Sequence, residues 1–171
     1  MTKVLGLDIS SSSSGFSIAA DGYLDIKSIG TIEPPPKLMT GAKLLFFEKA
    51  VKKLIKKHKP DVIVIEDIFK GPSVTVFKLL AMFRGVAFLI TQKELKKDPI
   101  SLLPTEARKL VGVGGITKED AYAFVVKKYN FTNFKFETHN DITDSIVLSL
   151  AYFNYTGPKP KKPKKRKAKI K

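Results

Sequence analysis

The sequence predicts an α/β fold in which a mixed five-stranded sheet, with three antiparallel strands first, is flanked by helices. Two observations predict it. Short runs of β-forming residues alternate with longer segments whose apolar residues recur at helical spacing. The chain of 171 residues also has the length of a single domain. It contains no cysteine, so the domain is stabilised without disulfide bonds.

Three strands are expected before the first helix. Val4–Ile9 is a short apolar run typical of a buried strand, and Gly15–Ala20 and Tyr23–Thr31 follow it. Asp21-Gly22 is a tight-turn signal, so these strands should form an antiparallel meander. Two further strands are expected later in the chain, at Val62–Ile65 and Ile100–Leu103.

Four helices are expected between and after these strands. The first, Leu44–His58, has apolar residues on one face and four lysines on the other, and Pro60 ends it. The second, Ser73–Leu95, is apolar nearly all round, which requires cover on more than its sheet-facing side and suggests a dimer interface. A helix capped by Thr117 and a last helix over Asn140–Asn154 complete the order.

The chain is strongly basic, with a formal net charge of +15. Residues 157–171 hold nine lysines or arginines and no acid, which leaves +6 on the other 156 residues. Such an excess favours a polyanionic partner, most plausibly nucleic acid, over a basic surface that serves solubility alone. We expect residues 1–156 to form the folded domain and the proline-interrupted tail 157–171 to be disordered when free.

The sequence also bears on where the protein acts. No run of about 18 apolar residues is present, and no signal-peptide layout, so neither a membrane span nor secretion is expected. An intracellular protein is expected, in a bacterial cytoplasm or in a nucleus or viral factory. The tail resembles a nuclear localisation signal, and a DNA tether explains it equally well. Its candidate DNA-binding residues are Lys161, Lys162, Lys164, Lys165 and Arg166.

Four carboxylates stand where a metal site would need them. Asp8 lies at the end of the first strand, and Glu66 directly follows the fourth. Asp141 and Asp144 lie three residues apart, on one face of the last helix. Because neighbouring strands end at one edge of an open sheet, we expect these groups to lie near one another. Carboxylates are ligands of Mg²⁺, and two such ions would activate a water and stabilise the leaving oxygen of a phosphodiester.

Each acid also has a simpler interpretation. Asp8 could cap the serine turn that follows it, and Glu66 could be a salt-bridge partner. Asp141 and Asp144 could compensate the dipole of a helix start. All four explanations would have to coincide in an otherwise basic protein, which favours the metal site. His139 could contact a metal or shuttle a proton, although a place at the helix start is the favoured interpretation. With two histidines and no cysteine, a zinc site has little support.

Several short motifs occur in order along the chain. They are Gly6-Leu7-Asp8-Ile9-Ser10, Ile65-Glu66-Asp67-Ile68-Phe69, Arg84-Gly85-Val86-Ala87, the basic, glycine-containing segment 104–118, and Asp141-Ile142-Thr143-Asp144-Ser145. Together, over residues 3–154, they resemble the RuvC-type Holliday-junction resolvases of the RNase H-like superfamily, phage and viral members included.

The resemblance implies an RNase H-like fold, a homodimer, and an endonuclease of DNA recombination or repair that nicks branched DNA such as four-way junctions, flaps and Y-shaped forks. It implies Mg²⁺ as the cofactor, with Mn²⁺ as a substitute. The catalytic metal ligands that it implies are Asp8, Glu66, Asp141 and Asp144. It places Phe69 near the branch point, and Arg108 and Lys118 by the scissile phosphate or its neighbours.

Other functions are compatible with the sequence. A single-lobed phosphate-binding domain of the actin and sugar-kinase type also begins with a strand, an Asp and a Ser/Gly loop, but such proteins enclose a nucleotide between two lobes. A non-catalytic nucleic-acid-binding protein would carry the acids as structural groups. Within nucleases, cleavage of RNA–DNA hybrids is a further alternative.

Overall fold

The computed structural model describes residues 1–68, 73–113 and 117–158. Over these ranges the chain forms five strands and five helices. In chain order they are β1 (Lys3–Asp8), β2 (Ser14–Ala20), β3 (Tyr23–Ile32), α1 (Thr40–His58), β4 (Val62–Glu66), α2 (Val74–Leu95), β5 (Ile100–Leu102), α3 (Pro104–Leu110), α4 (Lys118–Tyr129) and α5 (Phe136–Asn154).

The strands form one mixed sheet in the order β3-β2-β1-β4-β5. β1 pairs antiparallel with β2 and parallel with β4, while β3 and β5 are the edge strands. Asp21 and Gly22 turn β2 into β3, and both have positive φ, the backbone that a two-residue hairpin turn of this kind needs. The predicted α/β sheet with three antiparallel strands first is confirmed.

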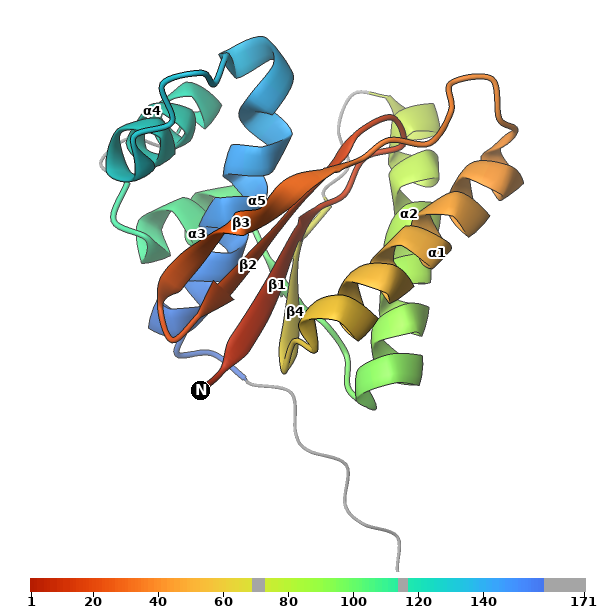
Figure 1. Cartoon of the computed structure of the whole chain (residues 1–171). Coiled ribbons are helices and arrows are strands. Elements are labelled where there is room, and N and C mark those ends of the chain that lie inside the picture. Colours follow the sequence, from red (N-terminus) through yellow and green to blue (C-terminus); the bar gives the residue numbers. More distant parts are fainter. Residues whose placement is uncertain (69–72, 114–116, 159–171) are drawn as a thin grey trace, which may run out of the picture.

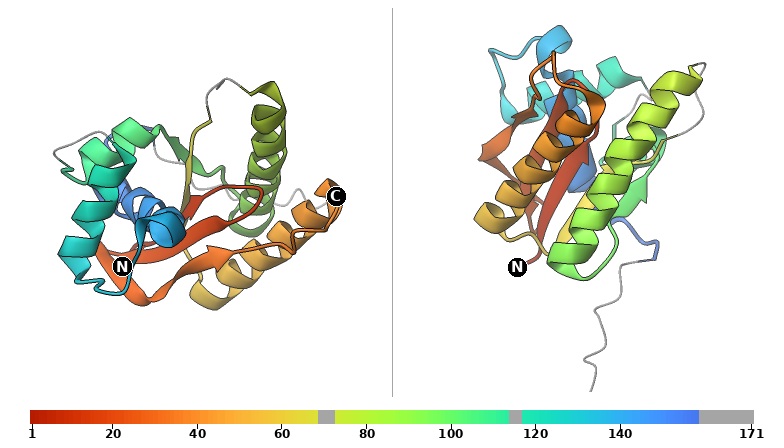
Figure 2. Two further views of the ribbon diagram at one scale, coloured as in Figure 1. Left: turned by 90° about the horizontal axis from the view of Figure 1, so that it is seen from above. Right: turned by 90° about the vertical axis from the view of Figure 1, so that its right-hand side faces the viewer.

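Helices cover both faces of the sheet (Figure 1, Figure 2). α1 and α2 lie on one face, and α3, α4 and α5 lie on the other. Because successive side chains of a strand point to opposite faces, β1 gives Leu5 and Leu7 to the core under α1 and α2, and Val4 to the core under α5. Cover on both faces explains why β1 and β4 are continuously apolar rather than alternating.

α5 lies directly against the backbone of β1 and β2, because two glycines leave room for it. A Cβ atom on Gly15 would lie 1.9 Å from the carbonyl oxygen of Asp141, and one on Gly6 would lie 2.3 Å from that of Ser145. The hydroxyl of Ser17 donates a hydrogen bond of 2.8 Å to the same Ser145 carbonyl. These contacts fix the helix that carries two of the candidate metal ligands.

The structure differs most from the prediction at three helices. α1 begins at Thr40 and α5 at Phe136, each four residues earlier than expected. The residues before them, Met39 and Lys135, make no side-chain cap, so the sequence holds no start signal at either place. α3 was not predicted at all, since its seven residues after Leu103 are too few to show helical periodicity.

α2 is long and apolar enough to cross a membrane by length and composition alone, with a mean hydropathy of 1.8 and 22% of that stretch buried. Lys78 and Arg84 interrupt its apolar residues, so that the stretch is apolar on average without being an uninterrupted apolar run. The fold uses α2 as part of a layer of the domain. Phe83, Ala87 and Ile90 pack into the core between α1 and the sheet, and the outer face is exposed.

The division into a domain over 1–156 and a tail over 157–171 stays a prediction, because residues 159–171 lie outside the described ones.

Replacing Gly15 by alanine is expected to lower the free energy of unfolding by about 1–3 kcal/mol, since the added methyl group would push α5 off the sheet. Urea denaturation measures the change. The matched control is Gly41→Ala in α1, where an added Cβ meets nothing within 4 Å. The control should keep its stability or gain up to about 1 kcal/mol from better helix propensity. Equal stability of both variants would contradict the close contact.

Candidate active site

The fold brings acidic side chains from three elements to one edge of the sheet. Asp8 is the last residue of β1 and Glu66 the last of β4, and these strands are parallel neighbours. Asp8 pairs with Gly15 across β1 and β2, and Gly15 lies against the Asp141 carbonyl. Asp144 follows one turn later on α5 and is buried. The predicted gathering of these four acids at the sheet edge is therefore what the structure shows.

The acids are close enough to raise one another's pKa. Burial raises the pKa of the Asp8 carboxyl well above its ordinary value, and the negative charges of Glu66 and Asp144 raise it further. Burial and the charge of Asp144 raise the pKa of Glu66 to about 7. Burial also raises the pKa of Asp144, against the opposing charge of Lys118. The site thus holds more negative charge than its surroundings neutralise, and a cation is its natural complement.

Lys118, the first residue of α4, is a cation of this cluster. Its ammonium nitrogen lies 2.8 Å from Oδ2 of Asp144 and 3.8 Å from Oδ1 of Asp141. Burial lowers the pKa of the ammonium, but the aspartate charges outweigh that effect and the pKa is raised overall. The start of α4 is fixed by a capping box between Thr117 and Asp120, as the sequence predicted.

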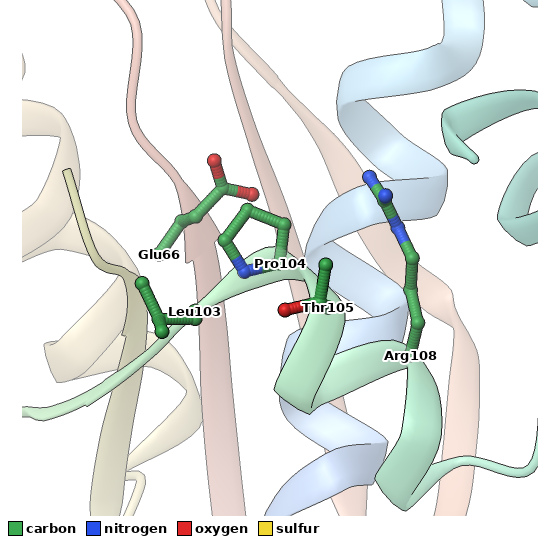
Figure 3. A pocket seen from close by; sticks show the side chains of 5 residues that line it. All are labelled: Glu66, Leu103, Pro104, Thr105 and Arg108. Carbon is green, nitrogen blue, oxygen red and sulfur yellow. The ribbon is translucent and has the colours of Figure 1, made fainter. Parts of the chain in front are cut away.

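Arg108 lies on α3, beside a pocket of about 470 Å³ next to Glu66. Figure 3 shows the carboxylate of Glu66 and the guanidinium of Arg108 pointing the same way on either side of Pro104 and Thr105. The positive charge of Arg108 lowers the pKa of both Glu66 and Asp144. α3 was missed by the prediction, and the predicted contact of Arg108 with the scissile phosphate stays a prediction.

His139 lies at the start of α5 and holds that start in place. Its Nδ1 accepts a hydrogen bond of 3.0 Å from the backbone N–H of Lys135, the residue that precedes the helix. Its ring stacks on Phe134 with 4.4 Å between centroids. These contacts agree with the favoured interpretation of His139 as a residue that flanks the helix.

Two of the simpler interpretations of the acids do not fit the structure. α5 begins at Phe136, so Asp141 and Asp144 lie beyond the first turn and do not compensate the helix dipole there. The serine turn after β1 is closed by its own side chains. The Ser10 N–H donates to the Ser14 hydroxyl at 3.0 Å, and that hydroxyl donates to the Ser10 carbonyl at 2.8 Å.

Two of the acids, Asp141 and Asp144, lie within ion-pair distance of Lys118. Among residues 1–68, 73–113 and 117–158, no three acidic or histidine side chains approach closely enough to hold a metal ion. The chemistry of the donors nevertheless fits a hard divalent cation, because all four are carboxylates and three have pKa values raised in part by burial without enough positive charge.

Several predicted DNA contacts lie outside the described residues and stay predictions: Phe69 at the branch point, and Lys161, Lys162, Lys164, Lys165 and Arg166 in the tail. In contrast, sequence reasoning gave no role to Arg84, which binds the end of β4. The signal available was a single arginine in an otherwise apolar stretch of helix.

Comparison with solved structures defines the class of protein. T. thermophilus RuvC in complex with a Holliday junction substrate matches with a TM-score of 0.76 at 12% identity, over 91% of this chain and 94% of that one. The yeast mitochondrial Holliday junction resolvase Ydc2 matches with a TM-score of 0.61 at 14% identity, over 90% and 78%. The fold is therefore the RNase H-like fold of these proteins.

The family follows from the sequence comparison. Residues 4–152 match the family model of the crossover junction endodeoxyribonuclease RuvC. Relatives of that name include those of Myxococcus xanthus, 25% identical over 90% of this chain and 81% of the relative, and Aliarcobacter butzleri, 29% identical over 88% and 97%. The chain belongs to the RuvC family, which confirms the resemblance. Nucleases of this family are metal-dependent and act inside the cell.

Without metal, the protein is expected to lose stability as pH rises, because Glu66 has a pKa of about 7 in the folded state and near 4.5 when exposed. A raised pKa favours the protonated carboxyl, so its stabilisation is complete below about pH 4.5 and is lost as pH rises through about 7. Compared with Glu66→Gln, the wild type should lose about 3 kcal/mol over that range, measured by urea unfolding in EDTA. Parallel pH profiles of the two proteins would refute the shift.

Proposed function

We propose that this protein is a metal-dependent endodeoxyribonuclease that nicks branched DNA, four-way junctions above all. The observation that carries the proposal is the cluster of four carboxylates at the sheet edge of a RuvC-family chain. The net charge of +15 supports a nucleic-acid substrate, because the DNA backbone is a dense row of negative charge. The relatives named above are crossover junction endodeoxyribonucleases, and one matched structure holds a Holliday junction.

Mg²⁺ is the proposed cofactor, with Mn²⁺ as a substitute, and Asp8, Glu66, Asp141 and Asp144 are the proposed ligands. When bound, the metal activates a water and stabilises the leaving oxygen of the cleaved phosphodiester. The chain itself supplies oxygen donors on rigid elements, since two acids end strands and two lie on a helix packed against the sheet. Burial of these donors keeps bulk water from weakening their interaction with a cation.

Lys118 and Arg108 are the proposed contacts to the DNA backbone. The Lys118 side chain is 39% exposed and its ammonium here neutralises Asp144, so the side chain reaches both the acids and the surface. Released from that carboxylate, it has three donors for a phosphate. Arg108 lies at the pocket beside Glu66 and offers a planar guanidinium to the same DNA backbone.

Phe69 and the basic tail, which lie outside the described residues, are proposed to contribute to DNA binding. Phe69 follows the last residue of β4 by three positions in the sequence, and stacking of its ring on an unpaired base would favour a branch point over linear duplex. The basic tail would add contacts to DNA phosphates of any sequence.

A homodimer is proposed because a four-way junction has two symmetry-related strands to cut, while each chain carries one acidic cluster. The outer face of α2 offers the interface. Large apolar side chains on it are at least half exposed, namely Val74, Val76, Met82 and Leu89. Several large apolar side chains exposed on one helix are typical of an interaction site.

Conservative replacement of any one acid is expected to slow nicking by orders of magnitude while junction binding persists. Asp8→Asn and Glu66→Gln remove a donor oxygen's charge without changing shape, and so weaken metal binding rather than the fold. Single-turnover cleavage of four-way junctions, flaps, Y-shaped forks and linear duplex with Mg²⁺ measures this, beside an electrophoretic binding assay.

The matched control for this assay is Glu119→Gln, an exposed acid next to Lys118 that is not part of the cluster. It should cleave as the wild type does. Normal cleavage by both Asp8→Asn and Glu66→Gln would overturn the metal site. Tight junction binding without cleavage in either Mg²⁺ or Mn²⁺ by the wild type would favour the non-catalytic binding protein, and preferential cleavage of RNA–DNA hybrids would favour an RNase H.

The dimer prediction is tested by placing a charge on α2. Leu89→Asp is expected to shift the protein from dimer to monomer at micromolar concentration, because a carboxylate in an apolar interface loses its hydration. Analytical ultracentrifugation measures the shift. The control is Leu45→Asp on α1, whose side chain is similarly exposed at 57% against 52%. A wild type that is monomeric both free and on a junction would leave an enzyme that nicks one strand at a time.

A further inference from the structure

We propose that Arg84 is a positioning residue, which fixes the end of β4 so that Glu66 points into the acid cluster. The inference rests on the proposed function, since it concerns the same site. It assigns a role in that site to a residue of α2, the helix whose outer face is the proposed dimer interface.

The guanidinium of Arg84 ties three segments together. Its Nη1 donates a hydrogen bond of 3.0 Å to the backbone carbonyl of Glu66, and its Nη2 donates one of 2.8 Å to the hydroxyl of Ser101 in β5. Nη2 also lies 2.9 Å from Oδ1 of Asp67. The guanidinium packs over the ring of Phe88, 5.1 Å from its centroid. One side chain thus connects α2, the end of β4 and β5.

The bond to the Glu66 carbonyl lies just beyond the last pair between β4 and β1, although Glu66 is still paired with Leu102 of β5. The ladder between β1 and β4 ends with Leu7 and Ile65, one residue before Glu66. On the other side, the N–H of Asp67 donates to the Leu102 carbonyl at 2.8 Å, which holds the chain to β5. Arg84 therefore adds a fixed hydrogen bond to the peptide that sets the direction of the Glu66 side chain.

Arg84 acts on Glu66 through the backbone and not through charge. The groups that shift the pKa of the Glu66 carboxyl, besides burial, are Asp144, Lys118 and Arg108. The contact of Arg84 is with the carbonyl oxygen, on the main chain. Replacing it should therefore move the carboxylate without changing the charge beside it, which separates a positioning role from an electrostatic one.

Arginine suits this position better than lysine. A planar guanidinium with several fixed donors can bind a carbonyl, a hydroxyl and a carboxylate together, whereas an ammonium is a single point on a flexible chain. Arg84→Lys keeps the positive charge and most of the packing but cannot hold all three partners. Residues that orient metal ligands typically change metal affinity or activity on the order of 10–100-fold when replaced.

The test compares Arg84→Lys with the wild type in three measurements. Mn²⁺ affinity is measured without DNA by electron paramagnetic resonance, nicking as the single-turnover rate on pre-bound junction, and stability as the urea midpoint. We expect Mn²⁺ binding and nicking to fall on the order of 10–100-fold, with junction affinity within about twofold of wild type. The control, Lys52→Gln, removes an ion pair of 2.6 Å with Glu48 on α1 and should change neither.

A merely structural ion pair predicts a different result. Arg84→Lys would then lower the urea midpoint and leave Mn²⁺ affinity and nicking by the folded protein unchanged, which would overturn the proposal. If Arg84→Lys does not fold, Ser101→Ala carries the test, because it removes one anchor of the guanidinium. A smaller loss of Mn²⁺ affinity supports the proposal, and no loss overturns it. A wild type that nicks no branched DNA refutes the proposed function alone, since the Mn²⁺ measurement still tests Arg84.

Discussion

The contact between α5 and the backbone of β1 and β2 decides where the acids lie. Helices usually pack on sheets through side chains, but here Gly6 and Gly15 let the two backbones touch. Because Gly15 is also the β2 partner of Asp8, one contact sets the position of Asp141 relative to the end of β1. Gly15 and Asp141 are more than a hundred residues apart in the chain, and their backbones are in direct contact with no side chain between them.

Because the acids are held in fixed positions, the unfavourable interaction between their negative charges is not relieved by movement. Asp8 and Asp144 are both held away from water, which raises the pKa of each, and the negative charge of Asp144 raises the pKa of Asp8 further. Lys118 offsets part of that unfavourable interaction, and its place at the start of α4 depends on the cap made by Thr117. A divalent cation is a stronger complement than one ammonium, which explains how a site can be stable enough to fold yet still favour a metal.

The fold and most site positions were predictable where local signals exist. Continuous apolar runs gave β1 and β4, and with them the ends at which Asp8 and Glu66 lie, while the cap at Thr117 gave the start of α4. The early start of α5 was not predictable, because Lys135 caps it without a side-chain bond. The close contact of Gly15 with α5 could not be predicted either, because the atoms next to Gly15 belong to Asp141 and Ile142, which are distant in the sequence.

α2 packs against the core with one face and is exposed on the other. Its inner face contributes Phe83 and Ile90 to the core, and Arg84 reaches from the same helix to the end of β4. Its outer face exposes Met82 and Leu89, the residues that flank that arginine by two and five positions. Pairing of two such helices would therefore restrain the element that holds Glu66, since a shift of α2 would move the Arg84 anchor. In the proposed dimer, pairing of the α2 helices and alignment of the acids would then be coupled through packing, without contact between the dimer interface and the acids.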